Sequence, residues 1–225
     1  MSFAQLIKNK KMMKMEKLER FYEKFPGSYV ALLTVVWVLI FHLISIILYN
    51  DPNYSLFTHY ISDLGASTSG SVQFWSVNMI VGSPIRVLIG LYLLGLLAKR
   101  GANEKSIKIT AYIILVGAIG SIIIALNPHD TSRAFHLIGA FTYFIGVVIA
   151  QTFFFKMELR AEEIPRYLPF ISILVVLVYF TFLSLEILVL ATGFFREIAC
   201  FSEWMALFSL MAWLGLHGYY THQIK

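Results

Sequence analysis

Six apolar runs of roughly 20 residues divide this chain, and they constrain its fold more than any other feature. A helix needs about 20 apolar residues to cross a hydrocarbon core of roughly 30 Å. Because lipid offers the backbone no hydrogen-bond partners, such segments cross the membrane as helices. The predicted spans are 28–49, 72–98, 107–126, 133–155, 168–192 and 199–220. We therefore predict an all-α polytopic membrane protein, a bundle of six transmembrane helices.

The composition leaves no room for a soluble catalytic domain. Hydrophobic residues make up 58% of the 225 and charged residues only 14%, whereas soluble domains carry roughly a quarter charged residues. We expect a cytoplasmic basic segment at 1–26 and a single transmembrane domain at 27–225. Cys200 is the only cysteine, which excludes an internal disulfide and a zinc site built on several thiolates. Its apolar surroundings predict inert burial.

The distribution of positive charge predicts the orientation in the membrane. Fifteen Lys and Arg residues lie at the two termini and in the 99–108 and 156–166 loops, whereas the opposite side holds only Arg133 and Arg196. The positive-inside rule then places both termini in the cytoplasm. The net charge of +5 thus reflects topology, and no nucleic-acid partner is expected. Apolar residues recur at helical spacing in the N-terminal segment and favour a short interfacial helix, with a frayed basic tail as the alternative. They are Leu18, Phe21, Tyr22 and Phe25.

The longest connection on the outer side, residues 50–71, contains the string HYISDLGA at 59–66 and no Lys or Arg. His59, Ser62 and Asp63 have the spacing that aligns side chains on one helical turn. Gly65 would permit a turn that a bulkier residue resists. Long loops commonly carry function, so we expect this motif to form one wall of a site.

A second polar string, NPHDTSRAFH at 127–136, opens the fourth span on the same side. If it is helical, His129, Arg133 and His136 share one face. Asn127 and Asp130 belong to the same string. The two strings together supply nitrogen and oxygen groups of the kind that bind a metal or a polar headgroup.

Ionisable residues inside the spans gather in the outer half. Glu186 and Glu203 fall in the outer leaflet, Asn78 lies about two turns deep, and Arg86 lies near the middle. A charge at this depth is costly unless it has a partner of opposite charge or lies in a water-filled cavity. We therefore expect an anion beside Arg86, and the candidates are Asp63, Glu186 and Glu203. The cytoplasmic half holds almost nothing comparable. Each residue alone could be an ordinary hydrogen-bonded helix-end residue, but convergence from several spans favours a pocket.

On HYISDLGA, Asn78, NPHD and His136, the chain resembles the prokaryotic six-span family filed as domain of unknown function 998, over about residues 28 to 222. More distantly it is similar to the eukaryotic group of damage-regulated autophagy modulators and glycosylphosphatidylinositol-lipid remodelling proteins. That group has threonine where this chain has Leu64. The resemblance implies a six-helix membrane fold with an outward polar site, and it implies no reaction. We expect the plasma membrane of a prokaryote, with HYISDLGA on the extracytoplasmic side.

Three functions remain open. The first is binding or handling of a membrane-lipid headgroup, in which arginine faces phosphate; its ligand-binding residues are Arg86, Arg133, Asn78, Asn127 and Glu203. The second is a zinc-dependent intramembrane hydrolase or transferase. Its predicted metal ligands are His59, His129, His136 and Asp130, and its catalytic residues are Asp63, Ser62 and Glu186. The third is a proton-coupled transporter, which needs a polar path that thins out below Arg86.

Overall fold

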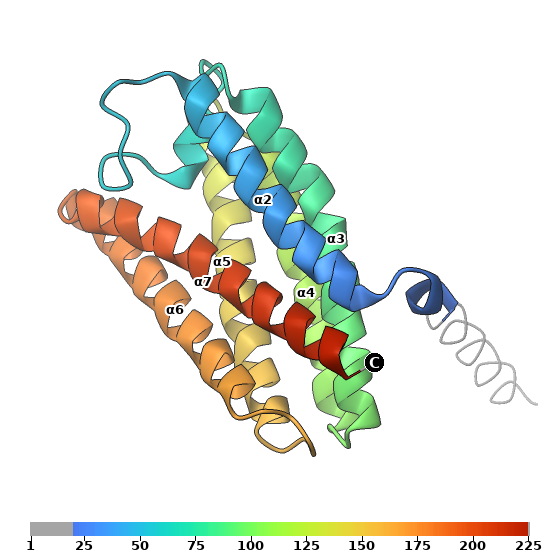
Figure 1. The fold of residues 1–225 in the computed structure, drawn as a ribbon. Coiled ribbons are helices and arrows are strands. Elements are labelled where there is room, and N and C mark those ends of the chain that lie inside the picture. The colour runs from blue at the N-terminus through green and yellow to red at the C-terminus, as the bar shows by residue number, and fades with distance from the viewer. Residues whose placement is uncertain (1–19, 225) are drawn as a thin grey trace, which may run out of the picture.

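The computed structural model describes residues 20–224 and shows a bundle of long helices (Figure 1). Within these residues the long helices are α2 (Gly27–Tyr49), α3 (Val72–Lys99), α4 (Glu104–Leu126), α5 (Arg133–Glu158), α6 (Tyr167–Thr192) and α7 (Arg196–Gln223). A short 3₁₀ helix, η1 (Ile61–Gly65), lies in the 50–71 loop. Each of the six long helices is long and apolar enough to cross a membrane. The prediction of an all-α integral membrane protein with six spans is confirmed.

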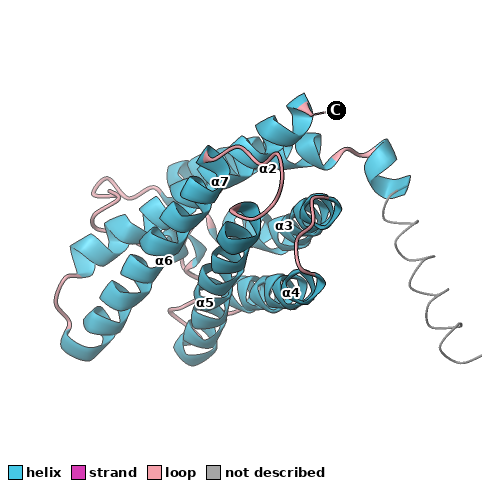
Figure 2. Cartoon of the chain, turned by 90° about the horizontal axis from the view of Figure 1, so that it is seen from below, coloured by secondary structure: helices cyan, strands magenta, loops and turns pink. Residues whose placement is uncertain are grey.

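The helices form a closed ring in chain order. Each helix packs against the next from α2 to α7, and α7 packs back against α2, as the view along the bundle shows (Figure 2). We call the end that carries the 50–71 loop the loop end, and the end where α2 begins and α7 finishes the terminal end. Both described chain ends therefore lie on the same side of the bundle.

Helix boundaries follow local chemistry. Asn103 caps α4 by accepting hydrogen bonds from the backbone nitrogens of Lys105 and Ser106 at 2.9 and 3.3 Å, the usual role of Asn before a helix. Asn50 and Gly193 end α2 and α6 in the left-handed conformation, which suits Asn and Gly best. Four boundaries differ from prediction by three residues, because α4 begins at Glu104, α5 extends to Glu158, and α7 runs from Arg196 to Gln223. Two of these extensions bring a charged residue, Glu158 or Arg196, into a helix. Both charged residues have partners inside the fold.

The tightest helix contact joins α4 and α5 through glycine. A Cβ added to Gly120 would lie 2.7 Å from the Tyr143 backbone nitrogen and 2.8 Å from the Gly139 carbonyl oxygen. Only glycine lets two helix backbones approach this closely, a common device in membrane helix pairs. This contact fixes the position of α5, which carries Arg133 and His136.

Helix α7 is the least apolar of the six. Its best window has a mean hydropathy of 1.4, against 2.7 for α6, and 56% of that window is buried, against 22% for α6. Trp204, Ala206 and Leu214 lie in its buried surface. Cys200 is fully buried there, as its apolar surroundings predicted. Several polar side chains of α7, namely Ser202, Glu203, His217 and Thr221, therefore face the bundle interior.

The described part of the N-terminal segment begins with a helical turn at residues 20–24. The Tyr22 hydroxyl donates a hydrogen bond to the Leu88 carbonyl oxygen at 2.6 Å, and burial together with neighbouring Tyr92 raises the pKa of Tyr22 to about 12. Residues 1–19, which hold the rest of the predicted interfacial helix, lie outside the described residues.

Candidate functional site: a polar cavity at the loop end

Helix α7 holds the 50–71 loop over the bundle. The Arg196 Nη1 donates to the Thr58 carbonyl oxygen at 2.7 Å, and the Trp204 indole donates to the His59 carbonyl oxygen at 3.1 Å. The Ile61 backbone nitrogen donates to the Glu203 carboxylate at 2.6 Å. These three contacts span two turns of α7, so the loop forms a fixed roof over the helices beneath it.

Asp63 organises η1 from within. Its carboxylate accepts a hydrogen bond from the Tyr60 backbone nitrogen at 2.9 Å, which satisfies a free N–H at the start of this short helix. The opposite side of the roof is tied to the turn between α4 and α5, where Asp130 accepts bonds from the Ser67 backbone nitrogen and hydroxyl at 3.0 and 2.6 Å. These bonds lower the pKa of Asp130.

Gly65 is required by packing and not by an unusual backbone angle. Among the described glycines only Gly101 and Gly193 have positive φ, so Gly65 needs no glycine-specific backbone angle, although a bulkier residue is resisted there as predicted. A Cβ at Gly65 would lie 2.3 Å from the indole ring of Trp75, whose side chain is buried in the bundle. The motif has glycine because an indole ring lies against its backbone.

Replacing Gly65 with alanine should therefore destabilise the roof. The added methyl group must displace a buried ring, and overpacking of this kind costs about 1 to 3 kcal/mol. We expect thermal unfolding in detergent at a lower temperature, with faster hydrogen exchange at η1. Gly95→Ala, the same substitution at a position where a Cβ meets nothing within 4 Å, serves as the control. An unaltered melting temperature in Gly65→Ala would contradict this packing.

Beneath the roof lies a cavity of about 290 Å³, which we call the outer cavity. Of the predicted site residues it is lined by Ser62, Asp63, His129, Arg133, His136, Glu186 and Glu203. They come from η1, the α4–α5 turn, α5, α6 and α7. Apolar side chains of α5 and α6, including Phe141, Phe182 and Leu190, form the rest of its wall. Residues of both polar strings thus line one space, whereas His59, Asn127 and Asp130 do not line it.

The charges around the outer cavity are partly paired. The Asp63 carboxylate lies 3.6 Å from Arg196 and 3.5 Å from the His129 ring. Arg196 also lies 5.1 Å from the centre of the Tyr60 ring. Arg133, in contrast, has no carboxylate oxygen within 4.0 Å among residues 20–224. It supplies a positive charge that is exposed at the cavity and not neutralised by contact.

Three buried polar atoms around the cavity make no hydrogen bond of standard geometry in the described chain: the Tyr60 hydroxyl, Nδ1 of His129 and Oε2 of Glu186. The Tyr60 hydroxyl and the Glu186 carboxylate interact with each other, so of the three only Nδ1 of His129 is unpaired. Burial, followed by the nearby Glu186 carboxylate, raises the pKa of Tyr60. Folded proteins pair about nine in ten buried polar groups, so the unpaired His129 nitrogen, beside the charged groups that line the same cavity, favours a polar ligand there.

The ring of His136 has a defined proton position. Its Nδ1 lies 2.8 Å from the Asn127 carbonyl oxygen. A carbonyl can only accept, so Nδ1 carries the proton and Nε2 of the neutral ring keeps a lone pair. His136 can therefore act at the cavity as a hydrogen-bond acceptor, a base or a metal ligand. Asn127 contributes through its backbone, since its side chain donates to the Ile123 carbonyl oxygen at 2.8 Å.

The predicted metal ligands are only partly brought together. The rings of His129 and His136 are 5.8 Å apart at their centres, whereas His59 points to Asp51 at 3.3 Å and stacks on Tyr54. Asp130 binds Ser67, as described above. Within residues 20–224 no group of three His, Cys, Asp or Glu side chains is arranged to hold a metal ion. The expected helical turn through His59 does not form, because η1 begins only at Ile61.

Asn78 and Arg86 lie deeper than the outer cavity. Asn78 is buried and its side-chain nitrogen lies 3.1 Å from Nδ1 of His42. Arg86 donates to the hydroxyl groups of Ser83 and Ser121 at 3.1 and 2.9 Å. None of the three carboxylates proposed as its counter-charge lies within 4.0 Å of it. That expectation was wrong, because Asp63 pairs with Arg196 and Glu203 holds the roof.

A comparison with protein families matches residues 31–220 to the family described as protein of unknown function (DUF998). The chain belongs to this family. The resemblance drawn from HYISDLGA, Asn78 and NPHD is thereby confirmed. Neither a curated protein nor a solved structure matches the chain significantly.

Sequence reasoning missed two residues of the outer cavity in this DUF998 protein. Arg196 was counted only as a loop charge and Tyr60 was not selected, yet both line the cavity. A signal was available for Arg196, because it was one of only two cations on its side of the membrane. No comparable signal existed for Tyr60, since tyrosine is common in membrane proteins.

The sequence patterns also gave no sign of a buried network in the terminal half of the bundle. Glu158 accepts a hydrogen bond from the Ser172 hydroxyl at 2.7 Å and lies 2.8 Å from Nε2 of His217. Trp213 donates to Ser172 at 2.8 Å. The network joins α5, α6 and α7 and corrects the expectation that this half lacks comparable polar groups. Glu158 escaped notice because it was assigned to a loop.

Proposed function

We propose that this protein binds the polar headgroup of a membrane lipid in the outer cavity. The observation that carries the proposal is that one cavity gathers the Arg133 guanidinium, the Tyr60–Glu186 pair and the unpaired Nδ1 of His129. Such atoms call for donors and acceptors on a ligand. A lipid headgroup supplies them at the depth where the cavity lies.

The shape of the cavity supports an amphipathic ligand. Its roof side is polar, and its α5 and α6 side is apolar through Phe141, Phe182 and Leu190. Arg133 and Leu190, on α5 and α6, are both exposed. The cavity therefore opens between these two helices toward the surrounding lipid. By this route a headgroup can enter from the side while its acyl chains remain in the bilayer.

Arg133 supports a phosphate-bearing headgroup. Its guanidinium presents parallel donors that match two phosphate oxygens, and no carboxylate competes for it at contact distance in the described chain. The acidic residues opposite, Glu186 and Glu203, suit hydroxyl or amine groups. The positive charges at the terminal end support an extracytoplasmic loop end, so the lipid would come from the outer leaflet.

Removing the Arg133 charge tests this proposal. Native mass spectrometry of gently solubilised protein should show a bound phospholipid that Arg133→Ala retains about tenfold less, because a charge-assisted contact is worth about 1.5 to 3 kcal/mol. Arg160→Ala, an exposed arginine at the terminal end, is the matched control and should keep the lipid. Equal occupancy in the two variants would refute headgroup binding at this site.

A hydrolase or transferase remains the second candidate, favoured by the groups that share the cavity. Ser62 offers a hydroxyl, His136 a free Nε2, and the Asp63–His129 pair a carboxylate beside an imidazole. Release of fatty acid from a labelled phospholipid, lost in His136→Ala and assayed with and without added zinc, would support this candidate over simple binding.

A further inference from the structure

Arg86 places a positive charge near the midpoint of α3, inside the bundle. Its Nη2 donates to the hydroxyls of Ser83 and Ser121 at 3.1 and 2.9 Å, whereas its Nε and Nη1 make no hydrogen bond within residues 20–224. No carboxylate oxygen of these residues lies within 4.0 Å of it. A guanidinium at this depth is costly unless an anion or water meets it. In the described chain, Arg86 therefore lacks a counter-charge and acceptors for part of its donor set.

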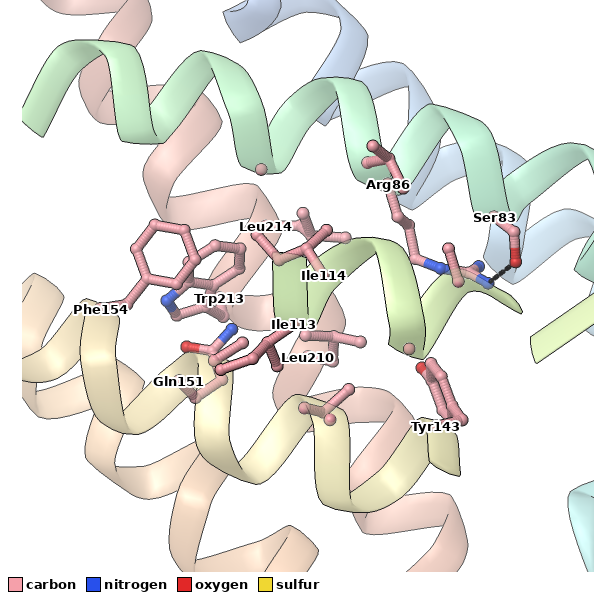
Figure 3. Close-up of a pocket in the computed structure, with 17 residues that line it drawn as sticks. Ser83, Arg86, Ile113, Ile114, Tyr143, Gln151, Phe154, Leu210, Trp213 and Leu214 are labelled. Carbon is pink, nitrogen blue, oxygen red and sulfur yellow. Dashed lines mark hydrogen bonds between the residues drawn. The ribbon is translucent and has the colours of Figure 1, made fainter. Parts of the chain in front are cut away.

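Two small cavities meet at Arg86. One, of about 80 Å³, lies between α3, α4, α5 and α7, and we call it the inner cavity (Figure 3). The other, of about 60 Å³, shares His136 and Glu203 with the outer cavity, and we call it the bridging cavity. Both are lined by Arg86 and Tyr143. A benzene-sized ligand occupies a cavity of about 150 Å³, whereas one water needs about 10 to 15 Å³. The two cavities therefore have room for a small ion or a few waters and not for an organic ligand.

The polar groups around Arg86 have hydrogens to donate. Ser83 is fully buried, and its hydroxyl, which accepts a hydrogen bond from Arg86, has no acceptor for its own hydrogen in the described chain. The Tyr143 hydroxyl lies 3.5 Å from that of Tyr179, which is longer than an ordinary O–H···O bond, so its hydrogen can turn elsewhere. Figure 3 shows Arg86, Ser83 and Tyr143 together at one end of the inner cavity. They offer N–H and O–H groups to one small space.

The rest of the inner cavity brings no negative charge to Arg86. Ile113, Leu210 and other apolar side chains form the middle of its wall, and no acidic residue of the described chain lines it. A water bound at Arg86 would turn its own hydrogens toward these apolar side chains, whereas a halide ion accepts hydrogen bonds and has none to donate. The acid in the bridging cavity is Glu203, whose carboxylate already accepts from the Ile61 backbone nitrogen at 2.6 Å. The site therefore suits a small anion better than water.

We propose that Arg86, together with the hydroxyls of Ser83 and Tyr143, binds one monovalent anion of halide size, such as chloride. One guanidinium balances one negative charge, and the inner cavity admits an ion that is only slightly larger than water. The bridging cavity shares residues with the outer cavity, which gives the ion a route from the loop end. The site goes beyond lipid binding, because loss of the anion at Arg86 leaves the Arg133 test unaffected. The two proposals therefore fail separately.

Binding of radioactive chloride tests the charge of Arg86. Purified protein in a neutral detergent, with gluconate holding the ionic strength constant, should bind chloride at one saturable site in a scintillation proximity assay. Arg86→Gln should weaken this binding about tenfold or more, the loss expected for a charge-assisted contact. Arg160→Gln removes an exposed arginine at the terminal end and should bind chloride normally. Unchanged binding in Arg86→Gln, or binding lost in Arg133→Gln instead, would overturn the proposal.

Thermal unfolding separates an anion site from a purely structural arginine. A ligand that binds the folded protein stabilises it by mass action, so chloride in place of gluconate should raise the melting temperature of the unaltered protein and not that of Arg86→Gln. In gluconate the variant should unfold no earlier than the unaltered protein, because it no longer buries an unpaired charge. If the variant unfolds earlier by the same amount in both salts, Arg86 acts only through Ser83 and Ser121, and the anion site is refuted.

Loss of a donor and the size of the ion complete the test. Ser83→Ala should weaken chloride binding about threefold or more, since it removes one hydrogen bond, and Ser184→Ala, at an exposed position on α6, should leave it unchanged. Bromide should displace chloride, whereas sulfate, which is larger and divalent, should not. Crystals grown in bromide should show anomalous density in contact with the Arg86 guanidinium. Displacement by sulfate as effective as by bromide, or anomalous density only at Arg133, would overturn the proposal.

Discussion

Replacing Glu158 with alanine is expected to lower the free energy of unfolding by about 3 to 5 kcal/mol, the range for removing one partner of a buried ion pair. The side chains of Glu158 and His217 are 2% and 5% exposed. His217 donates from Nδ1 to the Trp213 carbonyl oxygen at 2.8 Å, so its contact with Glu158 through Nε2 requires one further proton. The pair therefore shares a proton, and either group alone is left unsatisfied.

Two variants make this expectation specific. Glu158→Gln keeps the volume and can donate to His217 while accepting from Ser172, so it should lose much less stability than Glu158→Ala. Glu162→Ala removes an exposed carboxylate four residues away and should stay within about 0.5 kcal/mol. Unfolding by SDS titration in mixed micelles measures all three. If Glu158→Ala unfolds at the same SDS fraction as Glu162→Ala, the network contributes nothing to stability.

The second large effect concerns the α4–α5 contact. Gly120→Leu should cost about 3 kcal/mol or more, at the upper end for overpacking, because the atoms nearest to a new Cβ belong to the backbone of α5 and cannot rotate away. Separation of the helices would also move Arg133 and His136 in the outer cavity. We expect a lower unfolding transition and weaker phospholipid retention in the same variant.

Gly95→Leu provides the control. A Cβ at Gly95 meets nothing within 4 Å, and leucine favours helix by up to about 1 kcal/mol over glycine. The same substitution should therefore be neutral or slightly stabilising at Gly95 and strongly destabilising at Gly120. Similar stability of the two variants would show that α4 and α5 are not held at the close distance described.

The sequence contained enough to predict the helices and much of the outer cavity. Span length and apolar composition act locally, so all six helices were found without tertiary information. Depth in the membrane then brought Asp63, His136, Glu186 and Glu203 to one level, and the structure places them around one cavity. Depth is a single coordinate, however, and it sorts residues only along the bundle axis.

Which side chains pair with each other depends on how each helix is rotated about its own axis, and the sequence contains little information on that rotation. Helices such as α6 are apolar around most of their surface, so no polar face shows which side turns inward. Arg86 therefore received three carboxylate candidates, whereas the structure gives it Ser83 and Ser121. The predicted position of His59 at the site was wrong for a different reason, because its ring pairs with Asp51 in the same loop.

The polar interior surface of α7 has a consequence for how the chain enters the membrane. With Glu203 and His217 buried on one helix and the lowest hydropathy of the six, α7 gains least from lipid alone. The polar partners of these two residues, the 50–71 loop and Glu158, precede α7 in the chain and are therefore synthesised before it. We therefore expect α7 to enter the bilayer after α2 to α6 have assembled, so that its insertion closes the ring of six helices.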